Sequence, residues 1–174
     1  MFSSSASGHP VQNHVFFLSK YVCVFYVKMG LQNTQQKTIH PVLRTFDKYN
    51  YRRRTYGIVI NKQTNKVLLT SATGKAGAFI LPGGGIDPGE TPEESVVREV
   101  LEECGVVCKI DKYCQQVVNH SKKLRSWVYV CEKIEEMDDW PERDKRTRNW
   151  LSVEEARIVL MNHKADQADL LEFI

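Results

Sequence analysis

The sequence predicts one α/β domain in which helices cover both faces of a mixed β-sheet, with a separate extension in front of it. Two observations lead to this fold class. Apolar, β-branched runs of strand length stand before and after a single well-capped helix, and a second capped helix follows the last of them. The length of 174 residues fits one domain, and a hydrophobic content of 42% is enough to bury a core.

The strands are predicted from apolar runs that end at polar or glycine-containing segments. The predicted strands are residues 55–61, 66–70, 78–81, 106–110, 113–119, 125–133 and 149–151. Residues 140–148 form a charged loop before the last of them. Ser152 and Glu155 then have the spacing of a capping box that opens a helix over residues 153–161, and residues 166–174 should form one more short helix.

The central helix has clear signals at both ends. Thr91, Pro92 and Glu94 match an N-cap, a first-turn proline and the return partner of a capping box. Gly105 should end the helix in a left-handed conformation. Its apolar face, which should pack on the core, consists of Val96, Val97, Val100, Leu101 and Cys104.

Residues 1–40 are expected to be an N-terminal extension that is partly disordered, because their first part is rich in serine. They contain three lysines and no acidic residue, which accounts for the whole formal charge of +3. The apolar run at residues 15–27 is too short to span a bilayer. The folded domain should occupy residues 41–174, where acidic and basic residues balance, so we expect no stable nucleic-acid partner.

The cysteines indicate a reducing compartment, since they form no C-x2-C pair and no even set. They are Cys23, Cys104, Cys108, Cys114 and Cys131. We therefore expect a monomeric protein of the cytoplasm, and also of the nucleus. The alternative is export, if residues 15–27 act as a signal. A chain begun at Met29 would match the N-myristoylation pattern.

Three carboxylates of the central helix, Glu99, Glu102 and Glu103, stand at i, i+3 and i+4 and therefore share one face. Like charges at this spacing destabilise a helix by roughly 0.2–0.5 kcal/mol per pair unless a cation lies among them. Oxygen clusters of this kind suit Mg²⁺ or Mn²⁺. The preceding glycines, residues 83–85, allow close backbone approach, so the Gly84 carbonyl can join such a site. The alternative is a solvated, glutamate-rich surface helix.

The full spacing favours a metal site. It follows the pattern G-x5-E-x7-R-E-U-x-E-E-x-G-U, where U is aliphatic, at Gly84, Glu90, Arg98, Glu99, Val100, Glu102, Glu103, Gly105 and Val106. The non-aliphatic matches would coincide by chance on the order of once in 10⁸ starting points. The chain thus resembles the Nudix hydrolases. This resemblance implies an α/β/α sandwich, a divalent metal, and hydrolysis of a nucleoside diphosphate linked to another moiety or of a related pyrophosphate.

The same resemblance implies roles for the residues of the helix. Glu99 and Glu103 would be the principal metal ligands, and Glu102 would be the general base that accepts a proton from the attacking water. Arg98 would support this catalytic set through an ion pair with Glu90 that braces the glycine loop against the helix.

Basic residues outside the pattern bear on the substrate. Each one alone is expected to be a solvated surface charge, but several basic clusters in loops and at strand ends could converge on a ligand with many phosphates. The runs RTFDKYNYRRR, KKLRSWVYV, RTRNWLSVEEA and HKADQ resemble the diphosphoinositol polyphosphate phosphohydrolases, which also cleave diadenosine penta- and hexaphosphates. The residues that this resemblance assigns to phosphate binding are Arg44, Arg52, Arg54, Lys75, Arg125, Arg148 and Lys164, beside Gly83, Gly84 and Gly85. Residues 71–79 depart from that family, since they lack its usual aromatic and arginine-containing loop.

Two other functions stay open at this point. A nucleotide substrate, such as capped RNA, ADP-ribose or an oxidised nucleotide, would need an aromatic platform for its base, which Tyr56, Phe79 or Trp127 could provide. A catalytically silent module that binds polyphosphates is the third possibility, and the complete set of three glutamates argues against it.

Overall fold

The computed structural model describes residues 44–174. Its elements are β1 (Arg52–Asn61), β2 (Lys66–Ser71), β3 (Phe79–Ile80), α2 (Pro92–Cys104), β4 (Val106–Asn119), β5 (Leu124–Glu136), β6 (Arg148–Leu151), α3 (Val153–Met161), α4 (Ala165–Ala168) and the 3-10 helix η1 (Asp169–Phe173). The expectations for residues 1–40, and for a domain that begins at residue 41, lie outside the described residues. No helix within residues 44–174 is long and apolar enough to cross a membrane.

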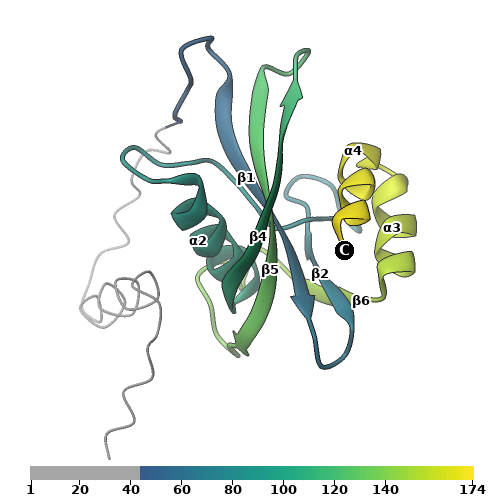
Figure 1. The fold of residues 1–174 in the computed structure, drawn as a ribbon. Helices are drawn as coiled ribbons and strands as arrows, with labels where there is room; N and C mark the ends of the chain where they lie inside the picture. Colours follow the sequence, from purple (N-terminus) through teal and green to yellow (C-terminus); the bar gives the residue numbers. More distant parts are fainter. Residues whose placement is uncertain (1–43) are drawn as a thin grey trace, which may run out of the picture. The chain divides into compact units, whose positions relative to one another are not determined.

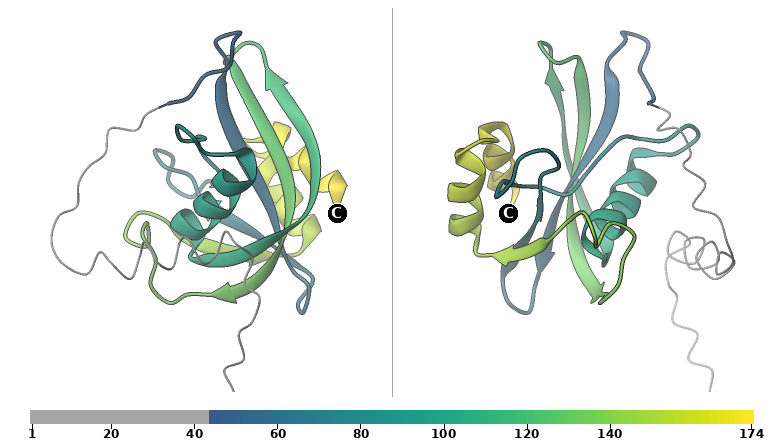
Figure 2. Two further views of the ribbon diagram at one scale, coloured as in Figure 1. Left: turned by 60° about the vertical axis from the view of Figure 1, so that its left-hand side comes forward. Right: turned by 180° about the vertical axis from the view of Figure 1, so that it is seen from behind.

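The strands form one mixed sheet in the order β3-β2-β1-β5-β4, and β6 pairs with β2. β1 runs parallel to β5, and every other pair is antiparallel. Helix α2 covers one face of this sheet and helices α3 and α4 cover the other (Figure 1). The two helical layers stay on opposite sides of the sheet when the molecule is turned (Figure 2). The α/β/α sandwich predicted from the sequence is confirmed.

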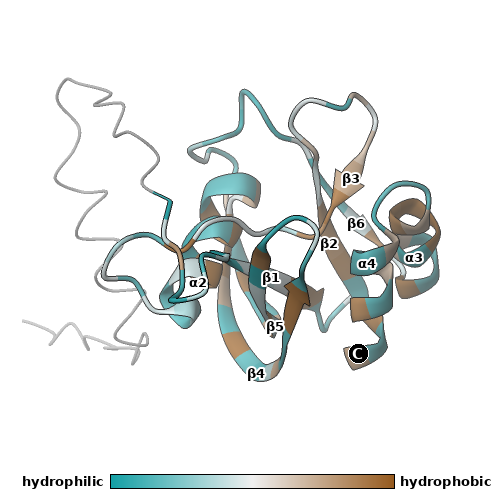
Figure 3. Cartoon of the chain, turned by 90° about the horizontal axis from the view of Figure 1, so that it is seen from above, coloured by the Kyte–Doolittle hydropathy of each residue, from teal (hydrophilic) through white to brown (hydrophobic). Residues whose placement is uncertain are grey.

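Side chains along the central strands alternate between two apolar layers, as the two-residue period of a strand requires. On β1, Ile58 packs in the layer of α3 and α4, whereas Val59 packs in the layer of α2. On β5, Val128 likewise packs in the layer of α3 and α4, and Tyr129 packs in the layer of α2. Seen from above, β1, β5 and β4 lie between the two helical layers (Figure 3). The sheet is therefore buried on both faces, and its loops carry the polar groups.

The caps of the two predicted helices are confirmed. Thr91 and Glu94 form both halves of the capping box of α2, and Gly105 ends that helix with a φ of 63°. Ser152 and Glu155 form the capping box of α3. The caps at Thr91 and Gly105 determine where α2, and with it the charged face, begins and ends.

The structure differs from the predicted elements in two places. The runs expected at residues 106–110 and 113–119 are one strand, β4, whose register shifts three times, between Val107 and Cys108 and around Asp111 and Cys114. Because β4 lies at the edge of the sheet, bulges and exposed polar residues are tolerated there. The helix expected at residues 166–174 is split into α4 and η1, since its second part tightens into a 3-10 turn.

Candidate active site

The glycine loop lies across β1 in front of α2. The backbone N–H groups of Thr55 and Gly57 donate to the carbonyls of Gly84 and Pro82 at 3.0 and 2.9 Å. On the other side, the N–H of Leu81 donates to the buried side chain of Gln167 in α4 at 2.9 Å. The loop is therefore held by the sheet and by the C-terminal helix at once.

The loop and the helix meet so closely at Gly84 that any side chain there would displace the Glu99 carboxylate. A Cβ at this position would lie 2.2 Å from Oε1 of Glu99. One residue earlier, the N–H of Gly83 donates to Oε2 of Glu103 at 3.0 Å. Two of the three predicted carboxylates thus lie directly against the glycine loop.

Arg98 ties the carboxylates of α2 to the loop. Its Nε donates to Glu90 at 2.8 Å, and its guanidinium also donates to the carbonyl of Gly85 at 2.9 Å. A third nitrogen donates to Glu99 at 2.9 Å and to Glu102 at 3.1 Å. The ion pair expected between Arg98 and Glu90 is therefore present, and the same guanidinium also positions two of the predicted catalytic carboxylates.

Burial changes the proton affinity of these carboxyl groups. It raises the pKa of Glu99 and of Glu102 above the usual value, while the charge of Arg98 opposes the shift. For Glu103, whose side chain is only 4% exposed, burial raises the pKa to about 7, against the opposing effects of Arg146 and the Gly83 N–H. The site therefore holds carboxyl groups that take up protons more readily than glutamates in water.

The repulsion expected among the three carboxylates is relieved by two arginines. Arg98 pairs with Glu99 and Glu102, and Arg146 pairs with Glu103. Within residues 44–174, no group of three His, Cys, Asp or Glu side chains is already drawn together as a metal site. The set is nonetheless suitable for a hard divalent ion. All of its ligating atoms are oxygens, and Glu99 and Glu102 each keep one oxygen that makes no hydrogen bond within the described residues.

Glu99 and Glu103 open into a cleft with a volume of about 450 Å³. The Gly83–Gly85 loop forms part of its wall. Basic side chains from four separate segments also line it: Arg52, Arg54, Lys122, Arg146 and Lys164. The lining thus combines these basic side chains with carboxylates, among which are also Glu142 and Asp166.

Arg52 and Arg54 stand at i and i+2 on β1, so both point into the cleft. The Nε atoms of both are buried and have no hydrogen-bond partner. Burial lowers the pKa of Arg52, and the positive charges of Arg54 and Arg44 lower it further. Buried donors of like charge without an acceptor indicate a place where an anion binds.

Arg148 does not lie in the cleft, in contrast to the sequence-based expectation, and Arg146 lies there in its place. Arg148 donates to the carbonyls of Cys104 at 2.9 Å and Met137 at 2.7 Å, and its guanidinium stacks 4.4 Å from the ring of Trp140. Arg148 therefore satisfies a carbonyl at the C-terminal end of α2. The sequence showed both arginines in one cluster but did not show which of them faces the carboxylates.

Arg125 is likewise held outside the cleft. It donates to Asp47 at 2.6 Å and to Gln116 at 2.7 Å. Its neighbour Ser126 lines the cleft, so the alternation of β5 turns Arg125 to the opposite face. The basic residue that this hairpin contributes to the cleft is Lys122, the first residue of the run KKLRSWVYV.

Two further predicted residues lie near the cleft but do not line it. Arg44 acts on the cleft through its charge, which lowers the pKa of Arg52. Lys75 lines a neighbouring pocket instead. Of the predicted carboxylates, Glu102 does not line the cleft. Its side chain is 33% exposed, and Arg98 links it to Glu99 by donating to both.

Comparisons with known proteins agree with this geometry. The sequence model of the NUDIX domain family matches residues 51–173. Diphosphoinositol polyphosphate phosphohydrolase 2 of Mus musculus is 36% identical over 132 residues, which cover 74% of each chain. Diphosphoinositol polyphosphate phosphohydrolase 3-beta of Bos taurus is 35% identical over 133 residues, covering 74% of this chain and 81% of the relative.

A solved structure supports the fold in the same way. The NUDIX hydrolase from Nitrosomonas europaea superimposes with a TM-score of 0.57 at 19% identity, over 71% of this chain and 88% of that one. Hydrolases of this family generally use divalent metals, which agrees with the oxygen donors on α2. The chain is therefore a phosphohydrolase that belongs to the Nudix family, and its similarity is to the diphosphoinositol polyphosphate phosphohydrolases within it.

Proposed function

We propose that this protein hydrolyses the diphosphate groups of diphosphoinositol polyphosphates in a Mg²⁺-dependent reaction, with diadenosine penta- and hexaphosphates as secondary substrates. The observation that carries the proposal is the pair of buried, unpartnered Nε atoms of Arg52 and Arg54, which open into one cleft with Glu99 and Glu103. The names of the relatives at 35–36% identity support the same substrate class.

The charge of the cleft fits a substrate with many phosphates better than one with few. A diphosphoinositol polyphosphate carries phosphates around a compact ring, so cations on several sides of the cleft can each meet one of them. Arg52 and Arg54 provide cations from β1, and Lys122, Arg146 and Lys164 provide them from three other segments. Arg44 adds long-range attraction, as its effect on Arg52 indicates.

Glu99 and Glu103 are proposed as the principal ligands of Mg²⁺, with Glu102 and the Gly84 carbonyl beside them and Mn²⁺ as an alternative ion. When bound, the ion neutralises charge on the phosphate oxygens and lowers the pKa of a bound water. The Gly84 carbonyl already accepts the Thr55 N–H, and its second lone pair remains for such a contact.

Glu102 is proposed as the general base. Burial raises its pKa, which makes its carboxylate a better proton acceptor, and Arg98 holds it through one oxygen so that the other can face the water. The water oxygen bonds to the terminal phosphorus of the diphosphate, and the bond from that phosphorus to the bridging oxygen breaks. Glu102 takes the proton of the water, and the products are inorganic phosphate and a monophosphate ester.

Two alternatives are kept for the test. A nucleotide such as ADP-ribose, capped RNA or an oxidised nucleotide would share the chemistry of Glu99 and Glu103 but would need an aromatic platform for its base. Of the aromatic residues expected for this role, Tyr56 lines the cleft, with Arg54 5.6 Å from the centre of its ring, and Phe79 lines the neighbouring pocket. A silent polyphosphate-binding module would keep the cations and show no turnover.

The test is turnover in the presence of Mg²⁺ of a set containing an inositol pyrophosphate, diadenosine hexaphosphate, ADP-ribose and capped RNA, with the products of each separated by chromatography, because only the inositol pyrophosphate releases inorganic phosphate. The proposal expects the inositol pyrophosphate to have the highest kcat/KM. Absence of inositol pyrophosphate turnover rejects it, and binding without turnover of any substrate supports the silent module. If Glu102→Gln and Glu103→Gln each leave the rate unchanged, the assignment of the metal site is wrong.

We also propose that the protein acts in the cytoplasm, and in the nucleus, as a monomer. The thiols of Cys104, Cys108 and Cys131 are free and buried, which suits a reducing compartment. Export remains the alternative. Fractionation of cells that produce the native chain, followed by size-exclusion chromatography of the protein, tests both statements.

A further inference from the structure

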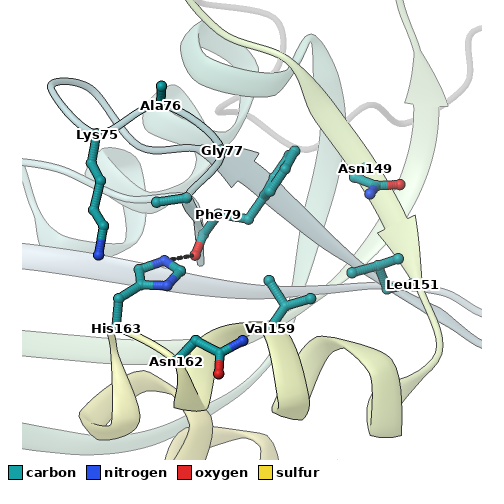
Figure 4. A pocket seen from close by; sticks show the side chains of 10 residues that line it. Lys75, Ala76, Gly77, Phe79, Asn149, Leu151, Val159, Asn162 and His163 are labelled. Atoms are coloured by element: carbon teal, nitrogen blue, oxygen red, sulfur yellow. Dashed lines mark hydrogen bonds between the residues drawn. The ribbon is translucent and has the colours of Figure 1, made fainter.

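A second pocket, with a volume of about 460 Å³, lies beside the catalytic cleft. Three segments form it: the loop before β3, strand β6 and the C-terminal end of α3 (Figure 4). Its volume is in the range that holds small organic ligands. The reaction proposed above uses no residue of this pocket.

The same two segments of the chain border the pocket and the cleft, although no residue lines both. Ala72 and Thr73 line the cleft, whereas Lys75 and the residues after it line the pocket. Similarly, His163 lines the pocket, and the next residue, Lys164, lines the cleft. A ligand whose phosphates occupy the cleft can therefore extend past these segments into the pocket.

The lining of the pocket differs in chemistry from that of the cleft. Phe79, Leu151 and Val159 give it an apolar floor and are only partly covered by the core. Two amide side chains, Asn149 and Asn162, stand at its rim (Figure 4). Apolar surface with a few polar groups at the edge is typical of a site for a flat organic group, whereas an inositol ring covered with phosphates would lose its hydration there.

Two further groups give the pocket a polar end. His163 contacts the carbonyl of Phe79 through Nε2 at 2.8 Å, so a neutral ring donates from Nε2 and keeps Nδ1 as an acceptor. The side chain of Lys75 extends towards His163 (Figure 4). A phosphate that links the two cavities would meet this ammonium group.

We propose that the second pocket binds the purine base of a nucleotide substrate whose polyphosphate chain lies in the catalytic cleft. The apolar floor contacts the face of the base, the amides of Asn149 and Asn162 meet its polar edge, and Lys75 meets the phosphate nearest to the nucleoside. The proposal rests on the proposed hydrolysis in the cleft and adds a site for the base of the dinucleoside polyphosphates proposed as secondary substrates. Lys75 does not line the cleft, so in this proposal it binds phosphate of nucleotide substrates only.

The test compares two tryptophan variants on two substrates. Asn149→Trp fills the pocket from an exposed position on β6, and Ile158→Trp, at a position that is 66% exposed on α3 and outside the pocket, is its matched control. For diadenosine hexaphosphate, Asn149→Trp should raise KM by about tenfold, the size of effect that a lost base contact has. For an inositol pyrophosphate, KM should stay unchanged in both variants. An unchanged KM for diadenosine hexaphosphate, or an equal rise for both substrates, would overturn the proposal.

A binding measurement separates this proposal from the proposed function. AMP added to the full-length wild-type protein should shift the NMR resonances of Phe79, Val159 and His163, and Lys75→Gln should weaken that binding. If AMP shifts none of these resonances, the pocket does not hold the base, whatever the hydrolytic activity is. If the shifts occur but no inositol pyrophosphate is hydrolysed, the pocket is supported and the proposed substrate class is rejected.

Discussion

Arg146, in the loop before β6, pairs with Glu103 in the last turn of α2, and both side chains are almost fully buried. The same guanidinium donates to Glu142 at 3.0 Å and to the carbonyl of Ser71 at 2.7 Å. One side chain therefore connects the end of β2, the loop before β6 and the carboxylate proposed to hold the metal. Because Arg146 lines the cleft, it can also meet a phosphate of the substrate.

The first prediction concerns this arginine. Arg146→Gln should lower kcat/KM for an inositol pyrophosphate by at least about tenfold, because a hydrogen bond to a charged group contributes roughly 1.5–3 kcal/mol. Steady-state kinetics at fixed Mg²⁺ measures the effect. Lys145→Gln is the matched control, since Lys145 is exposed and does not line the cleft, and its kinetics should equal those of the wild type. Equal kinetics of the two variants would contradict the role given to Arg146.

Arg148 should behave in the opposite way. Arg148→Ala leaves the carbonyls of Cys104 and Met137 without this donor and removes the contact with Trp140. Unfolding by urea should show a loss of about 2–4 kcal/mol, while kcat/KM of the folded variant changes little. A stable variant with a strongly raised KM would mean that Arg148 faces the substrate after all.

Gly84→Ala should displace the carboxylate of Glu99 without unfolding the protein. The new Cβ would lie 2.2 Å from Oε1 of Glu99, and that atom is at the end of a flexible side chain that can move away. We expect weaker Mg²⁺ binding by calorimetry and a kcat that falls at least about tenfold. Combining it with Glu99→Gln should lower kcat no further than the more damaging single change, since both act on one carboxylate. Additive losses would show that Gly84 acts through something else.

The raised pKa of Glu103 should make the stability of the metal-free protein depend on pH. Burial raises its pKa from 4.5 to about 7, so the folded state binds the proton more tightly than the unfolded state does. The stability that this group contributes is present below its unfolded pKa and is lost as the pH rises through about 7. Urea unfolding without metal should therefore show a fall in stability between about pH 5 and about pH 8 that is smaller in Glu103→Gln.

Added Mg²⁺ should counter that loss at the alkaline end of the range, because metal binding requires the carboxylate. A wild type and a Glu103→Gln variant with the same pH dependence would show that Glu103 does not titrate in this window.

The chemistry on α2 could be predicted from the sequence because it depends on local spacing. A helix places residues i, i+3 and i+4 on one face wherever the helix packs, so Glu99, Glu102 and Glu103 followed directly from the cap at Thr91. The ion pair of Arg98 with Glu90 followed from the same pattern. The alternation of apolar residues predicted most strands, and the sandwich followed from their order around the helix.

The composition of the cleft could not be predicted in the same way, because it depends on contacts between distant segments. One step in register turns a strand residue to the other face, which separates Arg125 from Ser126. Likewise, whether Arg146 or Arg148 faces Glu103 is decided by how the loop before β6 packs on the end of α2. The sequence showed which segments carry basic residues but not which of those residues face the cleft.

The most direct test of the account is the hydrolysis of an equal mixture of an inositol pyrophosphate and ADP-ribose, followed through the diphosphate signals of both compounds by ³¹P NMR with and without Mg²⁺. The account predicts that Mg²⁺ causes loss of the diphosphate signal of the inositol compound first, with release of inorganic phosphate, and that Glu103→Gln abolishes this change. Hydrolysis of ADP-ribose while the inositol pyrophosphate remains intact would contradict it.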